Sequence, residues 1–190
     1  MCKNRNKLAS LFIVAAFTLA ACSSNNTNKG ADKDSVGSDT VNNQSTTVEQ
    51  PAEAIVSASF KDEQGTAVNT QDLKGKVVFM NFWATWCPPC RKEMPSIQTL
   101  YNKFKDNEDI IFLIVEIEND SEGTKRFLAD GNLTLPIFYP QGDIPKEWLG
   151  GAIPTTVILD KSGKIAAKQE GMYDFAAKSV EDFIQNLISQ

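Results

Sequence analysis

The 190-residue chain contains no histidine and only four cysteines. Zinc sites take three or four protein ligands from cysteine, histidine and carboxylate side chains. Once the export signal described below is removed, the remaining cysteines are Cys22, Cys87 and Cys90. This supply of ligands disfavours a metal site, so we expect no metal ion, and we expect no cofactor.

Positive charge is also scarce, with 19 Lys and Arg against 24 Asp and Glu, a formal net charge of −5. Removal of residues 1–21 takes away Lys3, Arg5 and Lys7 and no acidic residue, which leaves 16 basic against 24 acidic residues and a charge of −8. A domain with this charge repels phosphate backbones. We therefore exclude nucleic acid as a partner.

The apolar run near the N-terminus, LASLFIVAAFTLA at residues 8–20, is too short to span a bilayer comfortably. It follows three basic residues, which is the arrangement of an export signal. The run leads into Leu19-Ala20-Ala21-Cys22, which resembles the lipobox of bacterial lipoproteins, whose cysteine becomes the acylated first residue. We predict a lipoprotein signal peptide at 1–21 and lipid attachment at Cys22. The alternative is an ordinary secreted protein with small residues near its cleavage site.

Residues 22–53 are rich in Asn, Ser, Thr, Asp, Lys and Gly and have almost no large apolar side chains. Such a segment cannot offset the entropy of ordering, so we predict a flexible tether. A chain of ~30 residues has an end-to-end distance of roughly 30 Å. We expect a folded domain at 54–190, lipid-anchored in the cell envelope on the extracytoplasmic side, facing the periplasm or at the outer membrane. Ser23 favours the outer membrane by the enterobacterial sorting rule.

Strand-like and helix-like patterns alternate through the rest of the chain, without an internal repeat. Continuous apolar runs predict strands covered on both faces, and spacing of three to four predicts amphipathic helices. The elements expected are a hairpin within 55–70, strands at 77–83 and 109–117, helices at 88–105 and 121–130, an extended piece at 135–140, a helical turn at 143–150, a hairpin within 153–171 and a helix at 176–188. This order predicts an α/β sandwich around a mixed sheet.

Cys87-Pro88-Pro89-Cys90 stands where a buried strand gives way to a helix. The pair could be half of a metal site, a structural staple or a redox centre, but metal ligands are scarce and a staple closing so short a loop adds little stability. A thiolate at a helix N-terminus is stabilised by the helix dipole, and Arg91 and Lys92 add positive charge. We expect Cys87 to be exposed and nucleophilic, and Cys90 to resolve the mixed disulfide.

Two segments carry a family resemblance: VVFMNFWATWCPPCRKEMPSIQ at 77–98 and GAIPTTVILDKSGKI at 151–165. They resemble the membrane-tethered TlpA/ResA-like thiol-disulfide oxidoreductases of the thioredoxin superfamily, from about Ala54 onward. The resemblance implies a thioredoxin-like fold, a central mixed sheet flanked by helices, with an N-terminal β-hairpin extension and a central insertion. It also implies disulfide exchange with cysteine-containing exported proteins. Because exported proteins meet an oxidising environment, we expect reduction, with electrons from a membrane donor of thiol-reductase type.

The resemblance assigns further residues. Pro154 matches the cis-proline that faces the cysteine pair in thioredoxin folds, and Ile153 would offer backbone groups to an extended substrate. Glu93 matches a glutamate implicated in proton handling. Its offset of three residues places it on the side of Cys90, where a desolvated carboxylate would have a raised pKa and exchange protons. The alternative is a surface glutamate in a first helical turn.

Four neighbouring residues are expected to shape the site. Asn81 replaces the buried aspartate of thioredoxins proper, and we predict a buried amide bonded to backbone. Trp83 is expected in the core and Trp86 as a partly exposed wall beside Cys87, where it would contact substrate. Pro95 lies within the helical pattern and should kink the helix.

Two other functions are considered. Peroxiredoxin-type peroxidases share the fold but need Pro-x-x-x-Thr/Ser-x-x-Cys, and the residues three before Cys87 and Cys90 are Ala84 and Cys87, so the motif is missing. A non-catalytic binding lipoprotein with a vestigial fold would not need both cysteines. Peroxide consumption and insulin reduction distinguish these alternatives from a thiol-disulfide oxidoreductase.

Overall fold

The computed structural model describes residues 56–190. The predicted signal peptide, the lipid site at Cys22 and the tether lie outside the described residues. No helix within 56–190 is long and apolar enough to cross a membrane.

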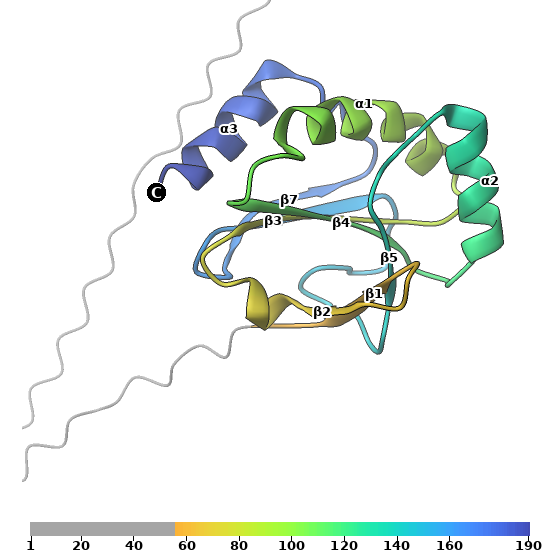
Figure 1. The fold of residues 1–190 in the computed structure, drawn as a ribbon, viewed down its shortest axis with the longest axis horizontal. Helices are drawn as coiled ribbons and strands as arrows, with labels where there is room; N and C mark the ends of the chain where they lie inside the picture. The colour runs from red at the N-terminus through yellow and green to blue at the C-terminus, as the bar shows by residue number, and fades with distance from the viewer. Residues whose placement is uncertain (1–55) are drawn as a thin grey trace, which may run out of the picture. The chain divides into compact units, whose positions relative to one another are not determined.

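A seven-stranded mixed sheet forms the centre of the described domain (Figure 1). Its strands, in chain order, are β1 (Ser59–Asp62), β2 (Ala67–Asn69), β3 (Val77–Trp83), β4 (Ile110–Glu116), β5 (Ile137–Pro140), β6 (Thr155–Leu159) and β7 (Ile165–Glu170). Their order across the sheet is β2-β1-β5-β4-β3-β6-β7. The three central strands β5, β4 and β3 are parallel, and both hairpins and the other pairings are antiparallel. The predicted strands and both hairpins are confirmed.

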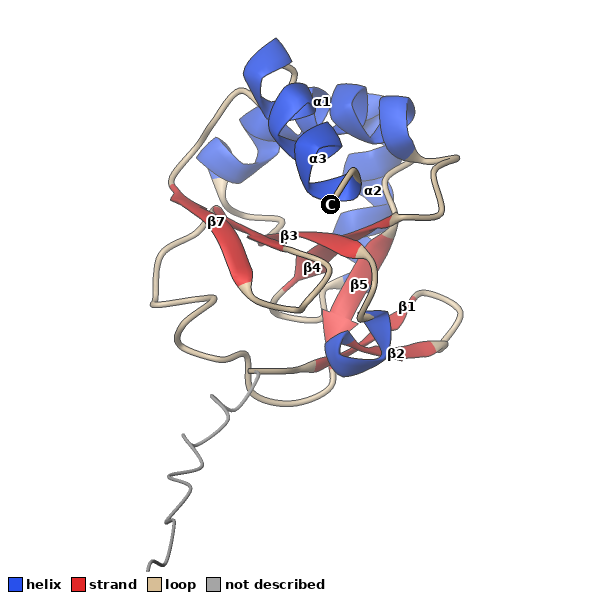
Figure 2. Ribbon diagram, turned by 90° about the vertical axis from the view of Figure 1, so that its left-hand side faces the viewer, coloured by secondary structure: helices blue, strands red, loops and turns tan. Residues whose placement is uncertain are grey.

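The α-helices α1 (Pro88–Phe104), α2 (Ser121–Gly131) and α3 (Lys178–Ile188) lie on one face of the sheet (Figures 1 and 2). The chain runs from β3 through α1 to β4 and then through α2 to β5, always toward the same edge. Because crossovers between parallel strands are right-handed, two steps in one direction place both helices on one face.

Within the described residues, no α-helix covers the opposite face. The 3₁₀ helix η1 (Thr70–Leu73) and the segment 144–149 pack there. The helical turn expected at 143–150 is a single turn, in which the N–H groups of Trp148 and Leu149 both donate to the Pro145 carbonyl at 3.0 Å.

Every residue of β3 is buried, because β3 lies between β4 and β6 and is covered on both faces. Val77, Phe79 and Trp83 join the core beneath the helices. The alternate residues, Val78, Met80 and Phe82, join the second core on the other face. The continuous apolar run therefore reflects a strand that supplies both cores.

Trp148 anchors the second face although it lies outside regular secondary structure. Its side chain is 1% exposed and packs in the core that contains Met80 and Phe82. Trp148→Ala is expected to lower the free energy of unfolding by about 3–5 kcal/mol, because it leaves a large cavity. Urea unfolding measures the loss, with Trp86→Ala, at a 61% exposed position, as the control. Equal midpoints for the two variants would contradict this account of the second core.

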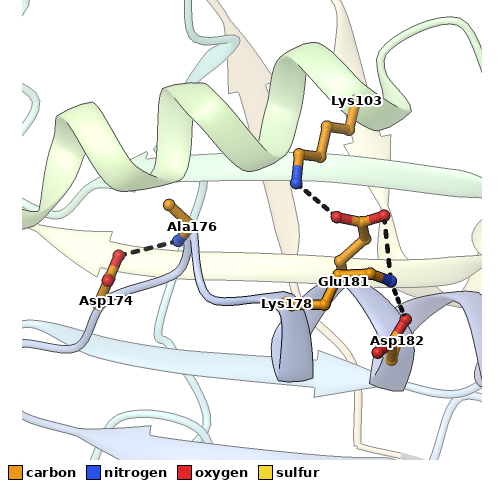
Figure 3. Close-up of polar contacts among 6 residues, drawn as sticks. All are labelled: Lys103, Asp174, Ala176, Lys178, Glu181 and Asp182. Atoms are coloured by element: carbon orange, nitrogen blue, oxygen red, sulfur yellow. Dashed lines mark hydrogen bonds and ion pairs between the residues drawn. The ribbon is translucent and has the colours of Figure 1, made fainter.

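Ion pairs join the C-terminal helix to its surroundings (Figure 3). Lys103 of α1 pairs with Glu181 of α3, and Lys178 pairs with Glu181 and Asp182 within α3. Asp174 accepts a hydrogen bond from the Ala176 N–H (3.0 Å) in the turn that leads into α3. Exposed pairs of this kind contribute little stability, so the apolar face of α3, with Val180, Ile184 and Leu187, is what binds it to the core.

Candidate active site

Cys87 and Cys90 form a disulfide at the N-terminus of α1. Cys87 is the N-cap residue, and its Sγ accepts a hydrogen bond from the Cys90 N–H at 3.3 Å. Pro88 and Pro89 occupy the first two helical positions, where a missing N–H removes no helical hydrogen bond and φ is already suitable. The local sequence therefore starts the helix at the point predicted, and the N–H of Cys90 is directed at the sulfur of Cys87.

The expectation that Cys87 is exposed is wrong for this oxidised form, because Cys87 is only 3% exposed and Cys90 is 0% exposed. The Cys87 Sγ lies 3.9 Å from the carbonyl oxygen of Ile153, on a loop 66 positions further along the chain. Both cysteines belong to the core beneath the helices. Cys90 is the more deeply buried of the two, as expected for a resolving cysteine.

The Ile153–Pro154 peptide bond is cis, as the resemblance implied. The Pro154 carbonyl accepts a hydrogen bond from the Gly171 N–H at 2.8 Å. The loop before β6 thus lies against the disulfide on one side and is tied to the end of β7 on the other.

The side chain of Glu93, a residue of α1, is buried with 2% exposure, so the alternative of a surface glutamate is wrong. Its Oε1 accepts a hydrogen bond from Asn81 Nδ2 (2.8 Å), and its Oε2 accepts one from the Tyr173 N–H (3.1 Å). Burial raises the pKa of Glu93 to about 7, and the two hydrogen bonds oppose that rise only partly. A carboxyl group with this pKa gains and loses a proton near neutral pH.

Asn81 is fully buried, but its predicted bonding to backbone is wrong. Its Nδ2 donates to Glu93 Oε1 and to Thr156 Oγ1 (2.9 Å). The side chain has these partners because β3 pairs with β4 and β6 on either side, and the ladders use the nearby backbone groups. Asn81 thereby holds the carboxylate of Glu93 in place.

Comparison with known proteins agrees with this geometry. The sequence model of the Redoxin family matches residues 46–176. The chain belongs to the Redoxin family. It is 33% identical over 127 residues to the thiol-disulfide oxidoreductase ResA of Bacillus cereus, covering 66% of this chain and 72% of the relative. It is 39% identical over 108 residues to the thioredoxin-like protein YneN of Bacillus subtilis, covering 56% and 64%.

A solved structure gives the same fold for this Redoxin protein. The thioredoxin domain of a thiol-disulfide oxidoreductase from Bacteroides vulgatus superposes with a TM-score of 0.56 at 29% identity, covering 68% of this chain and 94% of that one. The Redoxin chain is thus a TlpA/ResA-like member of the thioredoxin superfamily with a thioredoxin-like fold, and its activity is that of a thiol-disulfide oxidoreductase.

Trp83 and Trp86 of this Redoxin protein lie where the sequence predicted. Trp83 is fully buried, with its ring 5.3 Å from that of Phe127. Trp86 is 61% exposed and donates its indole N–H to Glu118 Oε2 at 2.9 Å. Arg91 lies over the ring of Phe127, with its guanidinium carbon 5.1 Å from the ring centre. Pro95 lies within α1, and its predicted kink stays a prediction.

A cleft of about 240 Å³ adjoins the buried carboxylate. It is lined by Lys92, Glu93, Ser96, Met172, Tyr173 and Asp174. Met172 and Tyr173 are exposed large apolar side chains at this opening. The lining of the cleft includes Glu93 and neither cysteine. Within residues 56–190 no group of three His, Cys, Asp or Glu side chains could hold a metal ion.

Sequence reasoning missed two sets of contacts. One is the loop after β7, where the Tyr173 N–H binds Glu93. The other is the acidic end of β4, where Glu116, Glu118 and Asp120 lie beside the active-site turn. The second set had a signal, since the carboxyl ends of neighbouring parallel strands meet at one edge of a sheet. The first had none, because it depends on a backbone group.

Proposed function

We propose that this thiol-disulfide oxidoreductase reduces disulfide bonds in cysteine-containing exported proteins, with Cys87 and Cys90 as its redox centre. The observation that carries the proposal is the cysteine pair at the N-terminus of α1, beside the loop with the cis Ile153–Pro154 bond, with Glu93 buried in the same helix three residues after Cys90. The helix N-terminus stabilises a Cys87 thiolate. The Glu93 carboxylate is proposed to accept the proton of Cys90.

The exchange proceeds in two steps. In the reduced protein the Cys87 thiolate attacks one sulfur of a substrate disulfide, which forms a mixed disulfide and releases the other substrate sulfur as a thiolate. Cys90 then gives its proton to ionised Glu93 and attacks the Cys87 sulfur. The second substrate sulfur leaves, and the Cys87–Cys90 disulfide forms. Two electrons have moved to the substrate.

Substrate binding is proposed at the surface between Trp86 and the Ile153–Pro154 loop. An extended substrate segment would pair with backbone groups of Ile153 in the manner of an added strand. Trp86, exposed beside the disulfide, would supply apolar contact.

The location and the electron supply complete the proposal. In an oxidising extracytoplasmic compartment the Cys87–Cys90 disulfide must be reduced again after each turnover, so the protein needs a membrane electron donor of thiol-reductase type. We propose that a lipid on Cys22 anchors the protein to the cell envelope, with its domain facing the periplasm or at the outer membrane.

Insulin reduction tests the activity. With dithiothreitol as electron source, the wild-type protein should accelerate the precipitation of reduced insulin chains, and the double variant Cys87→Ser/Cys90→Ser should not. A wild-type protein that leaves the rate unchanged would favour the binding lipoprotein, and one that consumes peroxide instead would favour the peroxidase.

Lipid attachment has its own test. Cys22→Ser should move the protein from the membrane fraction to the soluble fraction, because the acylated residue is lost. Cys2→Ser is the matched control, since Cys2 lies in the predicted signal peptide and should leave the protein on membranes. Membrane association that survives Cys22→Ser would overturn the lipoprotein proposal.

A further inference from the structure

A buried carboxylate that the exchange steps do not use lies at the end of β4. Glu116 is 0% exposed and pairs in register with Trp83, the last residue of β3. Its Oε2 accepts two backbone hydrogen bonds, from the N–H groups of Glu118 (3.2 Å) and Asp120 (2.7 Å). Its Oε1 has no hydrogen-bond partner among the described residues. Burying a carboxylate is unfavourable. In its buried position, Glu116 binds the backbone of the turn that follows β4.

The two residues held by Glu116 hold in turn the two residues that precede the active-site disulfide. Glu118 Oε2 accepts the indole N–H of Trp86 at 2.9 Å. Asp120 Oδ2 accepts the hydroxyl of Thr85 at 2.6 Å. One buried oxygen atom is therefore connected, through two backbone groups and two carboxylates, to both side chains.

The backbone of the turn is shaped for this contact. Asn119, between the two acids, has φ +61°, in the left-handed region that asparagine tolerates better than most residues. The Ser121 N–H donates to the Asn119 carbonyl at 3.0 Å, which closes the turn. The turn thereby directs the N–H groups of residues 118 and 120 toward the same oxygen.

We propose that Glu116 is a positioning residue for substrate docking, which fixes the turn 117–120 and through it holds Thr85 and Trp86 beside the disulfide. The inference rests on the proposed docking of protein substrates at Trp86. Loss of the acceptor should loosen Trp86 and weaken docking while the disulfide chemistry is preserved.

The charges around Glu116 make the contact sensitive to pH. Burial raises the pKa of Glu116, the N–H groups of Asp120 and Glu118 lower it, and the negative charges of the same two residues raise it further. Tyr139 is a further titratable group near Glu116, and the negative charge of Glu116 helps to raise the pKa of the Tyr139 hydroxyl. Protonation would weaken the two charge-assisted hydrogen bonds.

Three substitutions and a control separate the steps of the argument. Glu116→Met keeps the length of the side chain and removes the acceptor, whereas Glu116→Gln keeps an acceptor oxygen. Glu118→Ala removes the next contact in the series. Glu122→Ala is the control, an acidic residue of the following helix whose side chain is 75% exposed.

The Trp86 indole N–H resonance, assigned from the spectrum of Trp86→Phe, reports the position of the side chain in the oxidised protein. Glu116→Met should shift it toward its position in Glu118→Ala, and Glu116→Gln and Glu122→Ala should leave it near wild type. In the insulin assay, Glu116→Met and Glu118→Ala should raise KM roughly five- to thirtyfold, the effect of losing one to two kcal/mol of docking. The kcat and the rate of disulfide reduction by dithiothreitol should stay within about twofold.

The outcomes distinguish the inference from the function on which it rests. An active, folded Glu116→Met protein with wild-type KM and an unmoved Trp86 resonance overturns the role of Glu116 alone. A wild-type protein that does not reduce insulin overturns the docking proposal together with the proposed function. If Glu116→Met does not fold, the pH titration of the Trp86 resonance decides. Wild type should show a step that Glu116→Gln lacks, and identical titration curves would overturn the inference.

Discussion

Cys90→Ser should convert the protein into a covalent trap for its substrates. The variant keeps the attacking thiol at the N-terminus of α1, where the helix end stabilises the thiolate. It lacks the second thiol, so a mixed disulfide on Cys87 cannot resolve intramolecularly. Adducts should accumulate in cells and be visible as bands of higher mass under non-reducing conditions, with the bound partner identified by mass spectrometry.

Cys87→Ser is the matched control and should trap few or no partners. Its remaining thiol, Cys90, belongs to a residue that is 0% exposed in the oxidised form, so an incoming disulfide cannot reach it without rearrangement. If the two variants trap equally, the assignment of attacking and resolving roles is wrong. If neither traps anything while the wild type is folded and present, the exchange mechanism itself is overturned.

The identity of the trapped proteins decides the direction of exchange. Recovery of a few cysteine-containing exported proteins or components of haem maturation would support a reductase. Recovery of many newly secreted proteins with several disulfides would support an oxidase or isomerase. Within this fold reduction potentials run from about −270 to about −120 mV, a spread of ~7 kcal/mol for two electrons. The fold alone therefore does not set the direction.

The strand and helix that carry the cysteines could be predicted because their signals are local. The apolar run of β3 and the two prolines at the start of α1 each determine backbone structure within a few residues. The cis bond at Pro154 was anticipated from the family resemblance, because sequence alone favours trans for any X-Pro bond.

The side-chain environments could not be predicted because they depend on segments distant in the sequence. The carbonyl that covers Cys87 is 66 positions away, the hydroxyl that binds Asn81 is 75 away, and the N–H that binds Glu93 is 80 away. No periodicity within one element contains this information. The error over the exposure of Cys87 arose from treating a helix N-terminus as free, whereas the loop before β6 lies over it.

The burial of Glu93 predicts a large dependence of stability on pH. Its pKa is raised from 4.5 to about 7 in the folded protein. Between these values the folded state holds more protons than the unfolded state, so the free energy of unfolding falls as pH rises. The contribution of Glu93 is fully present below about pH 4.5 and is lost as pH rises through about 7. A shift of this size corresponds to about 3 kcal/mol.

Glu93→Gln removes this dependence and keeps a polar side chain of the same shape for Asn81 and Tyr173. The difference in the free energy of unfolding between the oxidised variant and the wild type should therefore rise by about 3 kcal/mol, in favour of the variant, as pH increases from about 4.5 to about 8.5. Urea unfolding at several pH values measures this difference. Glu122→Gln, at an exposed position, is the control and should follow the wild-type curve. In the reduced protein, Glu93→Gln should also change the pH profile of Cys90 alkylation, because the proposed proton acceptor is lost. Parallel stability curves for wild type and Glu93→Gln would mean that Glu93 does not titrate near neutral pH, and an unchanged alkylation profile would leave Asn81 and Glu93 with a structural role only.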